Sequence, residues 1–165
     1  MAANNITPPV ITVQIDSLEF QVTRNGSGGQ ECILWIRDKN QTRVFEALGW
    51  FSEYEKRRVL EFITRYVTSP DLREEISKKR FELHLETLTP SVFTEIETLG
   101  TEEKHNAFRT LFNLDSVVDQ HVDLGWKRRV LAKRFHPDRG GSTQFMTVIN
   151  EGYEQLHFLF SAKKK

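Results

Sequence analysis

Apolar and polar residues alternate along the first part of the chain, which is the pattern of half-buried β-strands. The alternation predicts strands at residues 11–15, 18–22, 32–37 and 41–46. We expect a turn at residues 16–17, a glycine-rich loop at 25–29 and a hairpin connection at 38–40. These segments are therefore predicted to form a small antiparallel β-hairpin or meander.

The apolar spacing becomes helical from Ser52 onwards. Ser52 and Glu55 have the spacing of a capping box, so a helix is predicted to begin there. Its apolar stripe consists of Tyr54, Val59, Leu60, Phe62, Ile63, Tyr66 and Val67. Further helices are predicted to begin at residues 69–70 and 89–90, where Ser or Thr as N-cap precedes a proline. Strands followed by helices indicate an α+β fold.

The last part of the chain is predicted to be helical throughout, beginning with a short helix at residues 105–114. A longer, basic helix covers residues 124–135 and ends there, because Pro137 disfavours a helical conformation at His136. The next helix follows Ser142 as its cap and has one apolar face, formed by Phe145, Ile149, Tyr153 and Leu156. We therefore expect a C-terminal antiparallel helical hairpin with a tight polar loop at its tip.

The predicted boundary between two domains lies at residue 100. Gly100 ends one predicted helix and Thr101 can cap the next. The charge balance also changes there, since residues 1–100 have an excess of acidic side chains and residues 101–165 an excess of basic ones. We expect an α+β domain over residues 1–100 and an all-α module over residues 101–165.

The whole chain has 23 Lys and Arg and 23 Asp and Glu, so its formal net charge is zero. This neutrality counts against a protein that binds nucleic acid or an anionic membrane through bulk charge. A local basic excess lies in residues 124–139, where Asp138 is the one acidic residue and the basic residues are Lys127, Arg128, Arg129, Lys133, Arg134 and Arg139. Any charge-driven partner is expected to meet this segment.

The sequence also bears on location and on chemistry. No apolar run approaches the ~20 residues of a membrane-spanning helix, and residues 1–9 lack the pattern of a secretory signal, so we expect a cytoplasmic protein. Cys32 is the sole cysteine, in a predicted strand, which indicates a structural thiol and excludes an intramolecular disulfide. We find no nucleophile–base pairing and no histidine spacing typical of a metal site. The sequence therefore predicts no catalytic residue, no metal and no cofactor.

The most specific motif is residues 131–142, which read Leu-Ala-Lys-Arg-Phe-His-Pro-Asp-Arg-Gly-Gly-Ser. Together with residues 149–156, Ile-Asn-Glu-Gly-Tyr-Glu-Gln-Leu, this segment resembles the J-domain, the helical module of DnaJ-type co-chaperones. The resemblance covers roughly residues 104–158. The chain departs from the family pattern at Arg128, where a buried aromatic residue is usual, and at Phe112, where glycine is usual.

The resemblance implies a co-chaperone that docks on the ATPase domain of a DnaK-type heat-shock chaperone and stimulates ATP hydrolysis. It implies that Asp138 accepts a charge-assisted bond from an arginine of the partner, that Pro137 directs this carboxylate outward and that His136 contacts the partner. The implied partner-binding residues are His136, Pro137, Asp138, Arg129, Lys133, Arg134 and Arg139. Residues 1–100 would then select a client or a location.

Two other functions are compatible with the residues. The basic helix 124–135 could contact nucleic acid, although the neutrality of the whole chain counts against this. A J-like assembly scaffold that has lost stimulation is the other alternative, and the intact tripeptide at residues 136–138 counts against that.

Overall fold

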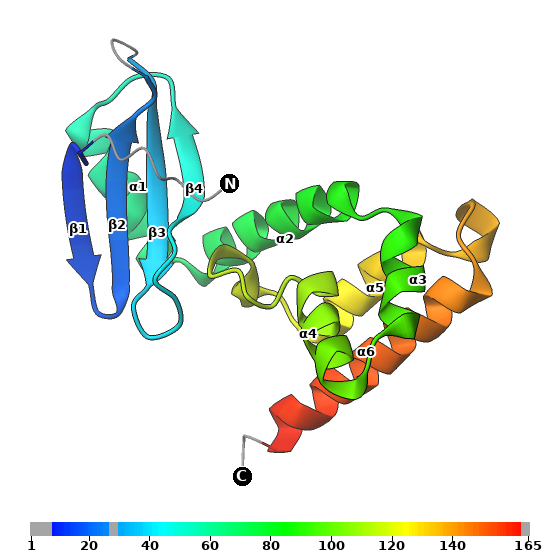
Figure 1. Ribbon diagram of the computed structural model, residues 1–165. Coiled ribbons are helices and arrows are strands. Elements are labelled where there is room, and N and C mark those ends of the chain that lie inside the picture. Colours follow the sequence, from blue (N-terminus) through cyan, green and yellow to red (C-terminus); the bar gives the residue numbers. More distant parts are fainter. Residues whose placement is uncertain (1–7, 27–29, 163–165) are drawn as a thin grey trace. The chain divides into compact units, whose positions relative to one another are not determined.

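The computed structural model describes residues 8–26 and 30–162 and has an α+β fold (Figure 1). The chain forms two compact units, Met1–Glu74 and Glu75–Lys165. The division therefore falls near residue 74 and not at the expected residue 100. The central part of the glycine-rich loop expected at residues 25–29 lies outside the described residues.

The first unit is a four-stranded antiparallel meander covered on one face by a helix (Figure 1). Its strands, in sheet order, are β1 (Ile11–Ile15), β2 (Leu18–Arg24), β3 (Cys32–Asp38) and β4 (Glu46–Phe51), and the helix is α1 (Lys56–Thr68). Alternate strand residues and one helix stripe are buried: Phe20, Val22, Leu34, Ile36, Val59, Ile63 and Tyr66. The strand alternation and most of the predicted strand positions are thus confirmed.

The strand predicted at residues 41–46 is wrong, because β4 begins only at Glu46. Asp38 closes a local turn instead: its carboxylate accepts hydrogen bonds from the Asn40 backbone N–H (2.9 Å) and the Gln41 side chain (3.1 Å). Its carbonyl also accepts from the backbone N–H groups of Gln41 and Thr42. These bonds turn the chain away from β3, so pairing with β4 starts at Ile36 and Glu46.

The first helix also begins later than the capping box suggests. Glu55 is the N-cap of α1 and makes no side-chain cap hydrogen bond. β4 continues to Phe51, so residues 52–55 are needed as the connection between strand and helix.

The second unit is helical. Its elements are α2 (Pro70–Thr87, which starts in the first unit), α3 (Pro90–Thr98), α4 (Thr101–Leu111), η1 (Val118–His121), α5 (Leu124–Arg134), η2 (Pro137–Arg139) and α6 (Thr143–Ala162). The predicted starts of α2 and α6 are confirmed by their caps, because Ser69 Oγ accepts from Leu72 N (3.2 Å) and Ser142 Oγ from Phe145 N (3.2 Å). α3 begins at Pro90 as predicted.

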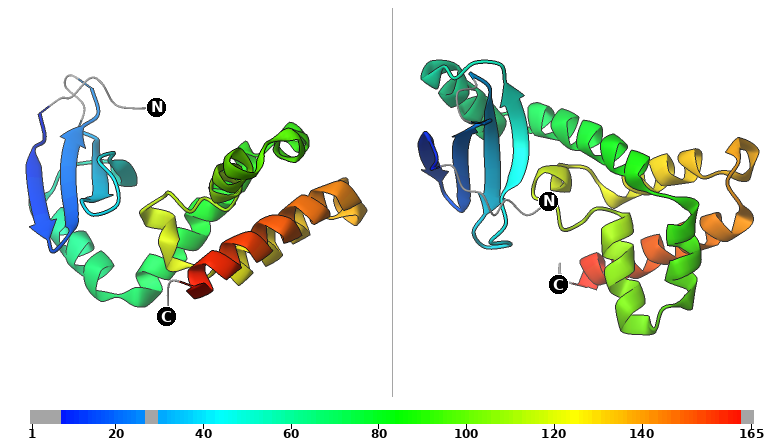
Figure 2. Two further views of the ribbon diagram at one scale, coloured as in Figure 1. Left: turned by 60° about the horizontal axis from the view of Figure 1, so that its bottom comes forward. Right: turned by 45° about the horizontal axis from the view of Figure 1, so that its top comes forward.

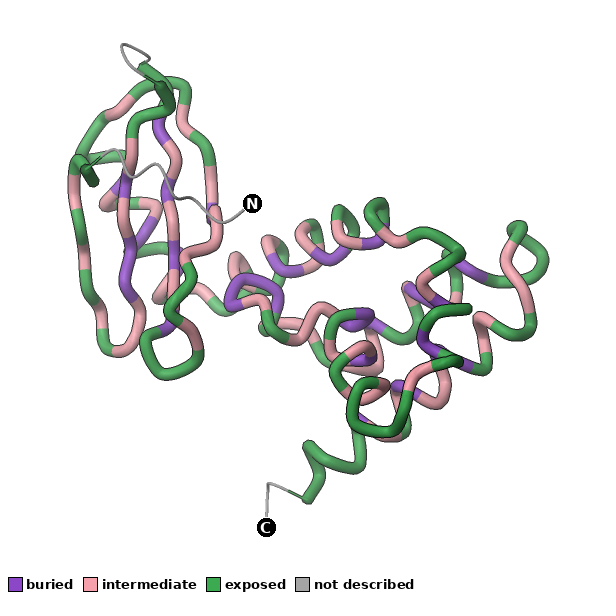
Figure 3. Tube along the Cα trace, in the orientation of Figure 1, coloured by how far each residue is buried: buried purple, intermediate pink, exposed green. Residues whose placement is uncertain are grey.

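One hydrophobic core joins all the α-helices of the second unit, which explains where the units divide. Phe81 and Leu85 of α2 and Phe93 and Ile96 of α3 are buried in the same cluster as residues of α4, α5 and α6. α6 packs against α3, α4 and α5 (Figure 2). Its last turns extend beyond this core, and Phe158 is 73% exposed (Figure 3).

Glu19 provides a pH-dependent contribution to the first unit. Its carboxylate accepts hydrogen bonds from Arg37 Nε (3.0 Å) and Nη2 (2.7 Å), which hold the pKa of Glu19 below its usual value of 4.5. A lowered carboxyl pKa stabilises the fold above the unfolded pKa, and this contribution disappears as the pH falls through the folded pKa.

We expect Glu19→Gln to lower the free energy of unfolding at neutral pH by about 1.5–3 kcal/mol, the usual contribution of a hydrogen bond to a charged group. The difference from the wild type should narrow as the pH falls below 4.5. Guanidinium-induced unfolding at neutral pH and below pH 4.5 measures this difference in free energy. Glu53→Gln, which changes an exposed acidic side chain, is the control. A difference that stays constant with pH would contradict the assignment.

Candidate functional site

α5 and α6 lie side by side, run in opposite directions and are joined by a short turn that contains η2 (Figure 2). The carbonyl of His136 accepts hydrogen bonds from Arg139 N (2.8 Å) and Gly141 N (3.0 Å). Gly140 has a φ of +85°, and its N–H donates to the Pro137 carbonyl (3.2 Å). Backbone bonds therefore close the turn, which leaves its side chains free to face solvent.

His136 and Asp138 are adjacent at the tip of this turn. His136 Nδ1 accepts from the Asp138 backbone N–H (3.2 Å) and lies 3.4 Å from Asp138 Oδ2. The Asp138 side chain is nevertheless 87% exposed, and that of His136 is 49% exposed. The structure thus turns the carboxylate outward, in the orientation that the resemblance implies for a partner contact.

The basic residues of α5 divide into an outward set and a set that is bonded to other elements of the unit. Arg129, Lys133 and Arg134 are exposed, as are Pro137 and Arg139 in the turn. All seven sequence-predicted site residues therefore reach the surface on one helix and the turn that follows it. Lys127 and Arg128 belong to the second set.

Arg128 attaches α5 to α6. Its Nε and Nη2 donate to Asn150 Oδ1 (3.0 and 2.9 Å), and its guanidinium lies 4.9 Å from the centre of the Tyr153 ring. Arg128 is thus accommodated by polar and cation–π contacts with the neighbouring helix.

Lys127 is fully buried, although the sequence places it in the basic excess. Its Nζ donates to the carbonyls of Phe112 (2.9 Å) and Asn113 (3.3 Å) and lies 3.4 Å from Asp119 Oδ2. Burial lowers the pKa of Lys127, and the nearby Asp119 opposes this shift. Lys127 is therefore a core cation and cannot contact a partner, which also removes it from the nucleic-acid alternative.

Three other observations lead to no functional assignment. In the described ranges, 8–26 and 30–162, no group of three or more His, Cys, Asp and Glu could hold a metal ion. Cys32 is buried in β3, and burial raises the pKa of its thiol. No helix within the described part of the chain is long and apolar enough to cross a bilayer.

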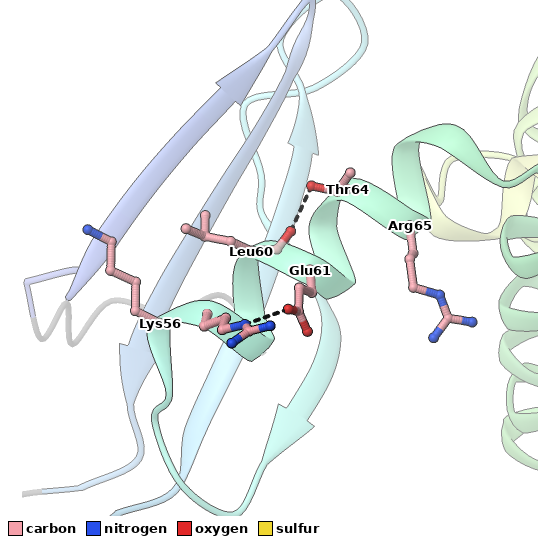
Figure 4. Close-up of a pocket in the computed structure, with 6 residues that line it drawn as sticks. Lys56, Leu60, Glu61, Thr64 and Arg65 are labelled. Atoms are coloured by element: carbon pink, nitrogen blue, oxygen red, sulfur yellow. Dashed lines mark hydrogen bonds and ion pairs between the residues drawn. The ribbon is translucent and has the colours of Figure 1, made fainter.

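A hollow of about 700 Å³ follows the outer side of α1 (Figure 4) and is lined by Lys56, Arg57, Leu60, Glu61, Thr64 and Arg65. Arg57 pairs with Glu61 (2.8 Å) and the Thr64 hydroxyl donates to the Leu60 carbonyl (2.9 Å). These polar groups bond along their own helix and do not converge on a ligand position, so the hollow offers no second candidate site.

Comparison with protein-family models, curated proteins and solved structures gives no match for this chain. The functional assignment therefore depends on the geometry of the turn and of α5, together with the motif that the residues carry.

Proposed function

We propose that the protein is a co-chaperone that binds a DnaK-type heat-shock chaperone and stimulates its ATP hydrolysis. In this proposal α4, α5 and α6 form a J-domain-like module, and the His136–Pro137–Asp138 turn with the outward face of α5 is its docking site. The observation that carries the proposal is the exposed Asp138 carboxylate at the tip of a closed turn, directly after a helix with outward cations.

The chemistry of the site suits a transient protein contact. An exposed carboxylate held by a rigid turn can accept a charge-assisted hydrogen bond from an arginine of the partner. Arg129, Lys133 and Arg134 would orient an acidic partner surface and raise the association rate more than the affinity. Binding through such exposed charges should be weak and should weaken further with added salt.

We further propose that this protein is cytoplasmic. Its N-terminal part would then select a client or a location. The sheet unit Met1–Glu74 is the part available for this role, because α2 and α3 contribute to the core of the helical unit.

The test is the steady-state ATPase rate of a DnaK-type chaperone with increasing amounts of this protein. The wild type should stimulate the rate, and Asp138→Asn should lose most of the stimulation, since truncating one partner of such a pair costs about 2–5 kcal/mol. Glu154→Gln, which changes an exposed acid on α6, is the matched control and should behave as the wild type.

Three outcomes would contradict the proposal. Equal stimulation by the wild type and Asp138→Asn would remove the turn from the mechanism. Binding without stimulation would favour the assembly scaffold, and salt-dependent binding of DNA or RNA at micromolar concentration would favour a nucleic-acid contact through α5.

A further inference from the structure

Three phenylalanine rings lie beneath the His136–Pro137–Asp138 turn, and we name Phe93, Phe135 and Phe145 the phenylalanine cluster. The centre of the Phe93 ring lies 4.7 Å from the centre of the Phe135 ring, in an edge-to-face arrangement. It also lies 4.7 Å from the centre of the Phe145 ring, in a stacked arrangement. Phe135 and Phe145 are 6.4 Å apart. Phe93 thus contacts both other rings more closely than they contact each other.

The positions of these rings in the chain make the cluster informative. Phe135 ends α5 immediately before the turn, and Phe145 lies in the first turn of α6 immediately after it. Phe93 comes from α3, which precedes the segment that resembles a J-domain. Phe93 is fully buried, so its contacts with Phe135 and Phe145 at the two ends of the turn belong to the hydrophobic core.

A polar contact also joins α3 to the start of α6. The Gln144 side-chain amide donates to the Glu97 carboxylate, and Gln144 is the residue before Phe145. The turn itself is closed by its own backbone bonds and exposes its side chains. Its orientation on the helical unit must therefore be set at its two ends, where α3 makes these contacts.

We infer that Phe93 is a positioning residue for the turn, and that α3 holds both ends of the turn through the phenylalanine cluster. Aromatic pairs at these distances contribute about 0.5–1.5 kcal/mol beyond the burial of their area. Loss of the Phe93 ring would release the ends of the turn together, while the helices stay folded around the remaining core. The consequence for the partner rests on the proposed co-chaperone function, but the effect on the turn does not.

The first experiment measures the turn directly in the full chain. Amide hydrogen exchange of Arg139, Gly140 and Gly141 reports the backbone bonds to His136 and Pro137. In Phe93→Leu this exchange should be about tenfold faster than in the wild type, because local opening of the turn costs less free energy. The control is Phe81→Leu, which removes an equally buried ring of α2 and should change the exchange little.

A second variant covers the case in which Phe93→Leu does not fold. Phe145 is half-buried at the start of α6, so Phe145→Leu removes the stacked pair with a smaller loss of core. It should accelerate exchange in the same three amides. Unchanged exchange in both variants, or equal acceleration in Phe81→Leu, would overturn the inference.

The second experiment separates positioning from general loss of stability. In the ATPase assay Phe93→Leu should raise the concentration for half-maximal stimulation by about threefold to tenfold, because the turn is no longer preorganised. Its maximal stimulation should stay near that of the wild type. Phe81→Leu, whose ring contacts Trp126 and Lys127 near the start of α5 and not the turn, should raise the half-maximal concentration less than Phe93→Leu. A lower maximum with an unchanged half-maximal concentration would overturn the positioning role. If the wild type fails to stimulate the ATPase, the proposed function falls, and the exchange result still decides the inference.

Discussion

Replacing Gly141 with alanine is expected to disrupt the turn between α5 and α6. A β-carbon at Gly141 would lie 1.8 Å from the carbonyl oxygen of Phe135 and 2.3 Å from its carbonyl carbon. Both atoms belong to the backbone, so no side-chain rotation can relieve the overlap. The backbone would have to move, which breaks the bond from Gly141 N to the His136 carbonyl. We expect a loss of about 3 kcal/mol in the free energy of unfolding, at the upper end of the usual cost of overpacking.

The neighbouring glycine provides the control for this prediction. Gly140 has a φ of +85°, and a β-carbon there would meet no atom within 4 Å, so this glycine is required for its backbone conformation and not for space. Gly140→Asn should therefore be mild, because asparagine tolerates the left-handed region. Guanidinium unfolding of both variants measures the difference. A Gly141→Ala variant as stable as Gly140→Asn would show that the turn is not packed in this way.

Local signals in the sequence predict the turn and most helix starts, but not the start of α1 or the bounds of α4, which is Thr101–Leu111 and not 105–114. The end of α5 follows from Pro137, and the starts of α2, α3 and α6 follow from a Ser or Thr cap, in two cases with a proline next to it. Each of these signals acts over a few residues, so no knowledge of the rest of the fold is needed. The outward orientation of Asp138, whose side chain is 87% exposed, is instead what the resemblance to the J-domain implies.

The features that sequence reasoning missed depend on contacts between distant residues. The start of β4 is set by the turn around Asp38 and by pairing with β3, which displaces the strand from the alternating segment. The unit boundary depends on Phe81 and Phe93, whose helical spacing does not show which core they join. The phenylalanine cluster is not visible in the sequence, since Phe93 is far along the chain from Phe135.

Lys127 was missed for a related reason. A lysine in a basic helix is usually a solvated residue. The available signal was its spacing, since Lys127 stands three residues after Leu124 and four before Leu131, on the apolar face of the helix. Its partners are the carbonyls that end α4 and the carboxylate of η1, which only the fold brings together. The cost of burying Asp119 and Lys127 together is offset by these bonds, by the hydrogen bond from Asn113 Nδ2 to Asp119 (2.7 Å) and by the Phe81 ring, 5.1 Å from Lys127 Nζ.

Lys127→Met is therefore expected to be strongly destabilising. It removes the cation that lies 3.4 Å from the fully buried Asp119 carboxylate, and removing one partner of a buried pair costs about 3–5 kcal/mol. Arg129→Met, two residues further along the same helix and exposed, should change stability by less than about 0.5 kcal/mol. Denaturant unfolding of the two variants distinguishes a buried cation from a surface one.

The double variant Lys127→Met with Asp119→Asn tests the pairing itself. Removing both charges should recover part of the loss, because the buried carboxylate that faced Lys127 is then absent and the remaining amide can still accept a hydrogen bond from Asn113. Additive losses from the two single changes would contradict an interaction between Lys127 and Asp119. The cycle also bears on function, since Lys127 fixes the inner face of α5 to α4 and η1. On the proposed co-chaperone function, a less stable α5 would present Arg129, Lys133 and Arg134 to the chaperone in a less defined orientation, so the same variants should raise the concentration needed for half-maximal ATPase stimulation.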